Sequence, residues 1–560
     1  MSYYSLFFEA RSIQSYIFDS GKMKEMVGAS ELIKQLCAAE LEEAIKKLGL
    51  DEIKPDDEAI SNLSCMENNQ VFFPRRSGGA FSALFADKAY RDRFLGVWSM
   101  CVNTFVPGLE VVYAVADGDD EDVNNDIQKL ISKTYKKLAY NRNFPPVILP
   151  EATPMHVLAP RTGKPAVENR EDEASRERIW TDEASIKKLE GAELVSKSES
   201  LSEAFLGDNK DKYSFPTNLE FDTNGNCEFP FKPDSRYLGL IHADGNALGQ
   251  TLLNIKENIT EGPKYAVTLR LFSENLEKST KEAAQAATEK LIEQFSKGDD
   301  YPVILPMRPL VLGGDDLTVL IRADLAMQFV VEYCKAFEVR TQENFAEIRK
   351  SHQEAIPEKL TACAGLAYVK NNQPFMDAFM LAEALCTESK KVSKALKRDI
   401  APATVTSRVV SNSFIESYSS YKEKELTIKK GDKEYIATLG AYAIDEEENE
   451  IPTLESLRAL CRELEKDGVT SASIREYATM IFGASHLADE KWRRWIEMLK
   501  KRNVFEGLKE CMGKFKINNL EDSPWTENLN TPVFDALQLL SMGDIGCDEI
   551  TSDEEGAENV

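Results

Sequence analysis

The chain has 560 residues, of which 42% are hydrophobic and 29% are charged, as in a folded globular protein of several domains. Its formal net charge of −26 disfavours a general nucleic-acid-binding protein, because phosphate binding depends on lysine and arginine. With no signal peptide, no apolar run of ~20 residues and no C-x-x-C pair among its ten cysteines, we expect a cytoplasmic protein without membrane contact or a zinc knuckle.

Two stretches of the chain share one order of predicted elements. The first starts with an apolar strand and an amphipathic segment in residues 3–18, and continues with a strand, a Gly-Gly turn and a strand in residues 71–85. The second starts in the same way in residues 237–252 and continues in residues 309–321. Each stretch follows the β-α-β-β-α-β order of a ferredoxin-like domain, so we predict an α+β protein with two such domains.

The chain between and after these stretches has a different character. Residues 151–235 are polar and charged with helical patches, which indicates a small helical insert or an ordered linker. Residues 411–560 are mainly helical and end in an acidic tail that we expect to be disordered. The predicted domains are therefore a first ferredoxin-like domain in residues 1–150, the insert, a second ferredoxin-like domain in residues 236–410, and the C-terminal helical region.

Acidic residues distinguish the second domain from the first. Alignment of the strands and of the glycine pairs places Ala10, Ala80 and Phe81 of the first domain opposite Asp244, Asp315 and Asp316 of the second. The spacing agrees, with 80 − 10 = 70 residues in the first domain and 315 − 244 = 71 in the second. This pattern predicts a duplication in which the second domain is catalytic and the first is degenerate.

The ferredoxin-like strand order 4-1-3-2 predicts that the three aspartates meet at one edge of the sheet. Asp244 closes the first strand, and Asp315 and Asp316 follow the Gly313-Gly314 turn and open the third. Carboxylates are preferred ligands of Mg²⁺ and Mn²⁺, and two such ions ~4 Å apart can activate a 3′-hydroxyl and hold a leaving pyrophosphate. A lone GGDD or DGN is more often a turn, but their joint position at strand ends favours a catalytic metal site.

Further residues near these motifs are candidate nucleotide contacts, namely Gly245, Asn246, Ser273, Gly313, Gly314, Lys390 and Lys394. The glycines would let phosphates approach the backbone, and the two lysines lie four residues apart on one helix face, where they could meet a triphosphate. The alternatives are a solvated lysine face, and capping or turn roles for the asparagine and the serine.

Together these motifs resemble a known family. The resemblance rests on IQSYIFDSGKMKEMVGASELI (13–33), HADGNALG (242–249), GGDD (313–316), and LTACAGLAYVKNNQPF with AEALCTESKKVSK (within 360–394). These segments are similar to the large polymerase-cyclase subunit of type III CRISPR effector complexes, whose palm domains are relatives of GGDEF diguanylate cyclases. The resemblance implies two palm (nucleotidyl cyclase-like) domains, ATP as substrate, two Mg²⁺ or Mn²⁺ ions on the three aspartates, and cyclic oligoadenylate as the usual product. It also implies partner subunits of a type III effector that bind guide RNA and the activating target RNA.

The chain departs from the family pattern at two points. None of its histidines is followed by aspartate, so we expect no HD nuclease and no cleavage of single-stranded DNA. The spacing for a four-cysteine zinc site between the palms is also missing. Some family branches join AMP to a different adenosine-bearing molecule, and the sequence leaves that product, the ring size and the activating signal open.

Two other functions stay open on the sequence alone. A GGDEF-type cyclase would share the metal site and use GTP, although the two-palm arrangement disfavours it. A non-catalytic scaffold subunit would dock RNA or a neighbouring subunit through the basic aromatic residues 491–502. The spacing of Trp492 and Trp495 favours instead an amphipathic helix packed on a core. Three acids on one sheet edge favour an enzyme over a scaffold.

Overall fold

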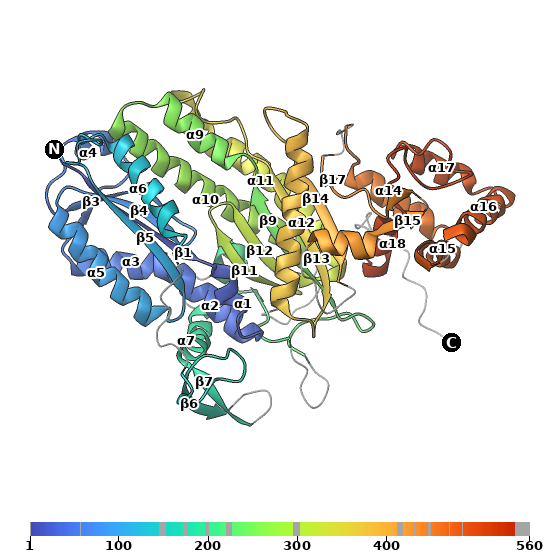
Figure 1. Cartoon of the computed structure of the whole chain (residues 1–560), viewed down its shortest axis with the longest axis horizontal. Coiled ribbons are helices and arrows are strands. Elements are labelled where there is room, and N and C mark those ends of the chain that lie inside the picture. Colours follow the sequence, from blue (N-terminus) through green and yellow to red (C-terminus); the bar gives the residue numbers. More distant parts are fainter. Residues whose placement is uncertain are drawn as a thin grey trace.

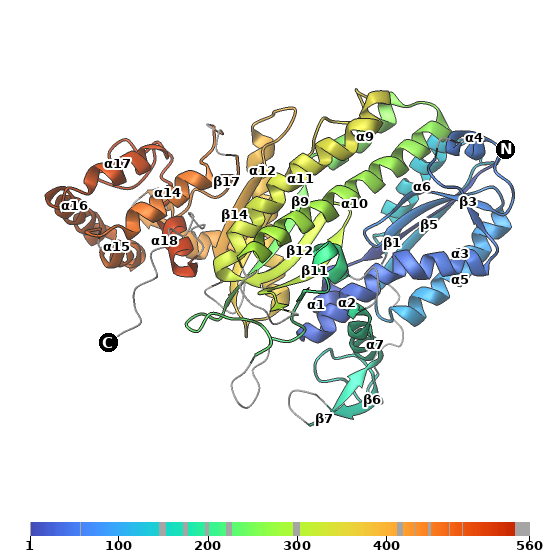
Figure 2. The ribbon, with the colours of Figure 1, turned by 180° about the vertical axis from the view of Figure 1, so that it is seen from behind.

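One sheet lies in the part of the molecule that carries the N-terminus, the second lies near the centre, and a helical region forms the opposite end (Figures 1 and 2). Among the helices of the described residues, none combines the length and hydropathy needed to cross a membrane. The structure is a computed structural model that describes residues 2–56, 58–144, 153–171, 177–196, 201–219, 227–294, 303–410, 418–430, 432–445, 448, 450–469, 471–483 and 485–543.

The first sheet has the strand order β2-β3-β4-β1-β5, in which β1 is antiparallel to both of its neighbours. Apart from the short β2, this is the 2-3-1-4 order of a ferredoxin-like domain, so the predicted fold class is confirmed here. The strands are β1 (Tyr4–Arg11), β2 (Asp51–Glu52), β3 (Gln70–Ser77), β4 (Ala80–Phe85) and β5 (Glu110–Asp117). The helices of this half are α1 (Ile13–Phe18), α2 (Met23–Gln35), α3 (Leu41–Lys47), α4 (Ala59–Ser64), α5 (Lys88–Phe105) and α6 (Ile127–Asn141).

The second sheet repeats this order as β11-β12-β9-β13 and extends it with β14 and β17. The strands are β9 (Tyr237–Gly245), β11 (Met307–Gly313), β12 (Asp316–Arg322), β13 (Ala362–Lys370), β14 (Thr404–Val409) and β17 (Tyr442–Ala443). The helices are α9 (Leu248–Asn258), α10 (Gly262–Glu293), α11 (Ala323–Ser351) and α12 (Phe375–Ala395). The repeated order supports the predicted duplication. The predicted alignment is wrong by one residue, because Ala80 pairs with Glu9 and with Ser77 as Asp316 lies beside Asp244 and pairs with Gly313. The first-domain residues at the places of Asp244, Asp315 and Asp316 are therefore Glu9, Gly79 and Ala80.

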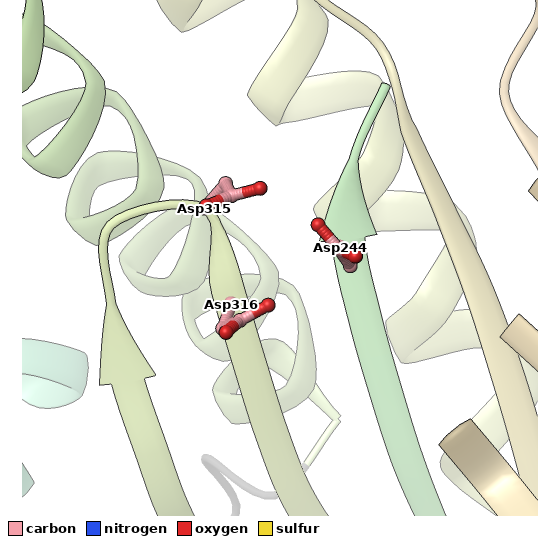
Figure 3. A group of neighbouring side chains, drawn as sticks. All are labelled: Asp244, Asp315 and Asp316. Atoms are coloured by element: carbon pink, nitrogen blue, oxygen red, sulfur yellow. The ribbon is translucent and has the colours of Figure 1, made fainter. Parts of the chain in front are cut away.

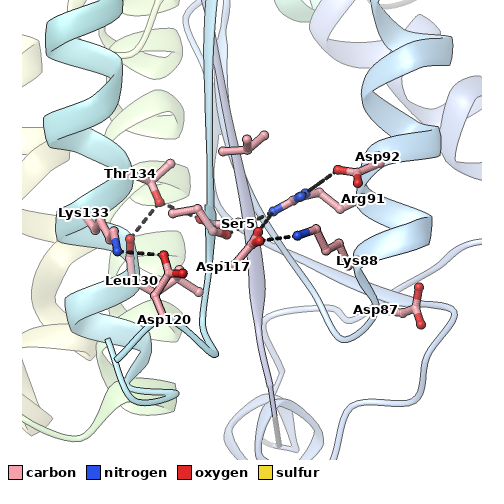
Figure 4. A network of polar contacts seen from close by, with 12 residues as sticks. Ser5, Asp87, Lys88, Arg91, Asp92, Asp117, Asp120, Leu130, Lys133 and Thr134 are labelled. Carbon is pink, nitrogen blue, oxygen red and sulfur yellow. Dashed lines mark hydrogen bonds and ion pairs between the residues drawn. The ribbon is translucent and has the colours of Figure 1, made fainter. Parts of the chain in front are cut away.

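Polar contacts hold α5 and α6 on the first sheet (Figure 4). The carboxylate of Asp117, at the end of β5, accepts hydrogen bonds from Lys88 and Arg91 of α5. On the other side, the hydroxyls of Ser5 and Thr134 lie 2.6 Å apart, which joins β1 to α6. All of these contacts lie where β5 ends and β1 begins. They therefore stabilise one end of the strands of this sheet, and Ala10 and Ala80 lie at the opposite end.

The insert contains an unpredicted β-hairpin in addition to helices. It consists of β6 (Ala166–Glu171), β7 (Arg178–Asp182), α7 (Glu183–Ala192) and α8 (Leu201–Leu206), and the hairpin projects from the body in Figure 1. Helix α7 packs on α2 at Gly28, where an added Cβ would lie 1.6 Å from the carbonyl oxygen of Lys188. Residue 28, the glycine of the GASELI segment, must therefore be glycine, because α2 and α7 cross too closely there for a side chain. The domain boundaries given above stay a prediction.

The C-terminal region packs on β14 through a buried ion pair. Arg408 of β14 donates to Asp535, whose other oxygen accepts hydrogen bonds from the Tyr442 hydroxyl and the Leu439 amide. The helices are α13 (Tyr418–Tyr421), α14 (Leu454–Glu465), α15 (Ser471–Gly483), α16 (Ser485–Lys501), α17 (Phe505–Gly513) and α18 (Val533–Met542), beside a hairpin of β15 (Thr427–Lys430) and β16 (Lys433–Ile436).

Helix α16 carries the basic aromatic segment that a scaffold function would use. Trp492 and Trp495 are 1% and 3% exposed, and the indole of Trp492 donates to the Leu520 carbonyl. Arg493 and Lys500 face the carboxylates of Asp522 and Glu521 at 3.5 and 2.7 Å. The tryptophans are therefore part of the core and cannot stack on RNA bases, which supports the amphipathic-helix interpretation.

Candidate functional site

Asp244 and the GGDD hairpin meet where β9 ends and β12 begins. The pairing of Leu317 with Ala243 sets Asp316 beside Asp244 on the neighbouring strand. Gly313 pairs with Asp316 across a two-residue turn, and Gly314 in that turn has φ 63°, which glycine adopts without strain. Asp315 therefore lies in the turn itself, whereas the sequence had placed it at the start of the strand.

The three carboxylates point to one another at this edge (Figure 3). One oxygen of each, from Asp244, Asp315 and Asp316, lies within 4.8 Å of the others. No other group of three or more potential metal ligands with this geometry is found in the described part of the chain. The distances fit ligation by oxygens at ~2.0–2.5 Å from a shared cation.

The electrostatics of the cluster favour added positive charge. Burial, together with the hydrogen bond and the charge of Asp244, raises the pKa of Asp315 from 3.8 to about 9. Burial and the charge of Asp244 raise the pKa of Asp316 to about 7. Burial alone would raise the pKa of Asp244, but the hydrogen bond from Asp315 and the nearby Lys390 ammonium lower it. Three charged carboxylates therefore need more cationic charge than one lysine supplies.

Lys390 is the cation that the chain itself brings to the cluster. Its ammonium forms an ion pair with Asp244 and donates to the Gly245 carbonyl oxygen at 2.8 Å. Helix α12 can reach this position because it packs tightly on β13 at Gly365, where an added Cβ would lie 1.9 Å from the Ala382 carbonyl oxygen. The predicted lysine thus contacts the aspartates directly, while Lys394 is exposed one turn further along α12.

The remaining predicted nucleotide contacts fall in different surroundings. Gly245 lies against Asp315, since its added Cβ would be 3.1 Å from the Asp315 Cβ. Asn246 is buried, and its amide donates to the Thr361 hydroxyl and the Cys363 sulfur, which favours a structural role over direct contact with a nucleotide. Ser273 is a partly buried residue of α10.

Helix α10 supports the turn through a residue that the sequence did not single out. Thr280 is 1% exposed, and its hydroxyl donates to the Gly314 carbonyl oxygen at 2.7 Å. Ser273 lies seven residues before it, so both side chains belong to the same face of the helix. No sequence motif marks Thr280, because a threonine within a long amphipathic helix has no distinctive pattern.

The first half of the chain contacts the back of the GGDD turn. Gly78, in the turn between β3 and β4, lies so close to Gly313 that a Cβ on Gly313 would be 3.1 Å from the Gly78 Cα. The two glycine turns of the duplicated sheets therefore meet. Beside them is a cavity of about 160 Å³ whose lining includes Lys34, Arg76 and Asp316. A second cavity of about 480 Å³ shares Lys34 and Gly313 with the first.

Comparison with known proteins gives a family for the strands and helices from β9 to α12. Residues 237–400 match the family described as Cas10/Cmr2, second palm domain. No curated protein matches the chain.

Similar solved structures include a Csm1-Csm4 cassette in complex with cA4, at 14% identity and a TM-score of 0.48, over 96% of this chain and 70% of that one. The same cassette in complex with one ATP has 13% identity and a TM-score of 0.44, over 96% and 70% of the two chains. Csm1 in T. onnurineus has 13% identity and a TM-score of 0.43, over 97% and 69%.

The matched segment contains all three aspartates, the GGDD turn and Lys390. The resemblance that the sequence motifs indicated is therefore confirmed for this segment, and residues 237–400 form a Cas10-like palm domain, similar to the second palm domain of Cas10/Cmr2.

Proposed function

We propose that this chain is a nucleotidyltransferase that makes an adenine-nucleotide second messenger from ATP. The product would be a cyclic oligoadenylate or a related AMP conjugate. The chain would act as the signalling subunit of an RNA-guided antiviral complex, with other type III effector subunits holding guide RNA and target RNA. The family match supports this assignment, and ATP is favoured over GTP because the family resemblance implies it.

A single observation carries the proposal. Asp244, Asp315 and Asp316 crowd their carboxylates within 4.8 Å at the end of two strands, with Lys390 as their cationic neighbour. Packing alone does not require this arrangement, because clustered carboxylates repel one another. The set of hard oxygen donors suits Mg²⁺ or Mn²⁺, and the raised pKa values of Asp315 and Asp316 fit a site that becomes fully charged only with such ions.

In the proposed reaction the 3′-oxygen of one ATP bonds to the α-phosphorus of another molecule, and the bond from that phosphorus to the bridging oxygen of pyrophosphate breaks. The hydroxyl proton leaves to solvent, and pyrophosphate departs. Two divalent ions, when bound, would supply activation of the hydroxyl and neutralisation of the pyrophosphate. The aspartates would hold these ions, Lys390 would orient Asp244, and Thr280 would fix the turn through Gly314.

The test is mass spectrometry of the products from labelled ATP with Mg²⁺ or Mn²⁺, in the presence and absence of partner subunits and target RNA. The double variant Asp315→Ala with Asp316→Ala should make no product while it still folds and assembles. The matched control is Asp119→Ala with Asp432→Ala, which removes two exposed carboxylates outside the cluster and should leave product formation unchanged.

Three outcomes would decide between this proposal and the alternatives. Unchanged product in the Asp315 and Asp316 variant would remove the catalytic assignment. Incorporation of GTP in place of ATP would favour the GGDEF-type cyclase. Normal assembly without any nucleotide product under all conditions would favour the scaffold function.

A further inference from the structure

Helix α6 and the residues that follow it form a basic segment on an acidic protein. Residues 127–144 contain five cationic side chains and no aspartate or glutamate, while the whole chain has a net charge of −26. The helix covers one face of the first sheet and lies on the outside of the molecule (Figure 1). Its cationic residues are Lys129, Lys133, Lys136, Lys137 and Arg142.

Two of these cations form close ion pairs, and the other three form none with the residues that the structure describes. Lys133 is bound by the carboxylate of Asp120 (Figure 4) and by that of Asp122. Arg142 forms an ion pair with Glu9. In contrast, the ammonium of Lys137 donates to a backbone carbonyl oxygen, that of Val115, at 3.0 Å, and it also interacts with the charge of Asp122, which already binds Lys133.

Lys129 and Lys136 have exposed side chains and form no ion pair with any residue that the structure describes. Their charges are therefore available to an anionic partner.

Exposed aromatic rings accompany these charges. Tyr140 and Phe144 are 65% and 52% exposed, and their rings make an edge-to-face contact with centroids 5.2 Å apart. Lys129, Lys136 and Tyr140 follow spacings of seven and four residues, so they lie on one face of the helix. The opposite face, which includes Leu130 and Leu138, is buried against the sheet. The rings and the free ammonium groups therefore share the solvent-facing side of α6.

We propose that this outer face of α6 binds single-stranded RNA. The ammonium groups of Lys129, Lys136 and Lys137 would contact phosphates, and unstacked bases would stack on Tyr140 and Phe144. The face is about 22 Å long at 1.5 Å per residue, which is enough for several nucleotides. A base-paired duplex is disfavoured, because its bases are already stacked. The choice of RNA over DNA rests on the proposed function, but the binding does not depend on catalysis and is measured separately.

The experiment measures fluorescence anisotropy of a labelled polyuridine oligonucleotide of about ten nucleotides against the full chain, over a range of salt concentrations. The variant Lys129→Gln with Lys136→Gln should weaken binding and reduce the slope of log K against log salt by about 1.4, or ~0.7 for each lost phosphate contact. The matched control is Lys46→Gln with Lys509→Gln, which removes two exposed lysines from other helices and should change neither quantity.

A second variant tests the stacking component. Tyr140→Ala with Phe144→Ala should reduce affinity roughly ten-fold or more and leave the salt slope unchanged. All of these side chains are exposed, so circular dichroism should show wild-type folding.

Several results would overturn the proposal. Equal losses in the test and control lysine pairs would show non-specific attraction, and unchanged affinity in the aromatic variant would exclude stacking. Tighter binding of the matching DNA would refute the choice of RNA, and binding of an acidic peptide or of anionic lipid vesicles in preference to the oligonucleotide would assign the face to another partner. The Asp315→Ala with Asp316→Ala variant should bind the oligonucleotide like the wild type, so a failure of the proposed catalysis would leave this result standing.

Discussion

Replacement of Asp315 by asparagine should stabilise the protein in the absence of divalent ions. At a separation of 4.8 Å and an effective dielectric of ~20, each like-charged pair in the cluster costs about 3 kcal/mol, and about 1 kcal/mol if water screens it fully. Asparagine keeps the shape and removes one of the three charges. We therefore expect the free energy of unfolding to rise by about 1 to 3 kcal/mol at alkaline pH in EDTA.

The pH dependence follows from the direction of the pKa shift. The pKa of Asp315 is raised to about 9, so the folded protein binds a proton that the unfolded chain has already released above its ordinary pKa of 3.8. The free energy of unfolding of the wild type should therefore fall as the pH rises from 3.8 to about 9, and this loss should be complete above pH 9. The asparagine variant lacks this loss, so the difference between the two proteins should grow with pH.

Divalent ions should reverse the order of stability. Mg²⁺ at 100 times its dissociation constant should stabilise the wild type by about 2.7 kcal/mol, and it should stabilise the variant much less. Thermal unfolding is best followed by circular dichroism, because no tryptophan lies between residues 181 and 491 to report on this region. A variant that is less stable than the wild type in EDTA at every pH, or one that gains as much from Mg²⁺, would refute the reasoning. Asp432→Asn, at an exposed position, is the control.

Two further variants test the residues around the cluster. Gly78→Ala and Gly21→Ala place alanine at φ 62° and 68°, so each variant should lose about 1 kcal/mol of stability. Only Gly78→Ala should reduce product formation, by about ten-fold or more, because Gly78 borders the GGDD turn. Equal activity in the two variants would show that the turn contact is not needed. Lys390→Gln removes the ammonium that holds Asp244 and the Gly245 carbonyl oxygen in place. If this orientation matters more than the charge that is lost, metal titrations of product formation should shift to 10–100-fold higher concentration, whereas Lys391→Gln should not shift them.

The sequence was sufficient to predict which strand ends form the site, because the backbone topology determines this. Strand order 4-1-3-2 follows from two apolar β-α-β-β-α-β patterns, and this order alone puts the end of the first strand beside the start of the third. The approach of Asp244 to the GGDD hairpin could therefore be expected from residue spacing. The hairpin in the insert was missed, since β6 and β7 are mostly exposed and their alternation is weak.

The tertiary structure alone decided what surrounds the aspartates. Asn246 was predicted to contact a nucleotide, yet its amide is used inside the fold by Thr361 and Cys363, which lie more than a hundred residues away in the chain. Thr280 and Gly78 support the turn from elements whose local sequence gives no sign of it. Local patterns determine the strands and their ends, because side-chain periodicity is a property of neighbouring residues. Contacts between distant elements depend on how the layers pack, and only the folded chain brings those residues together.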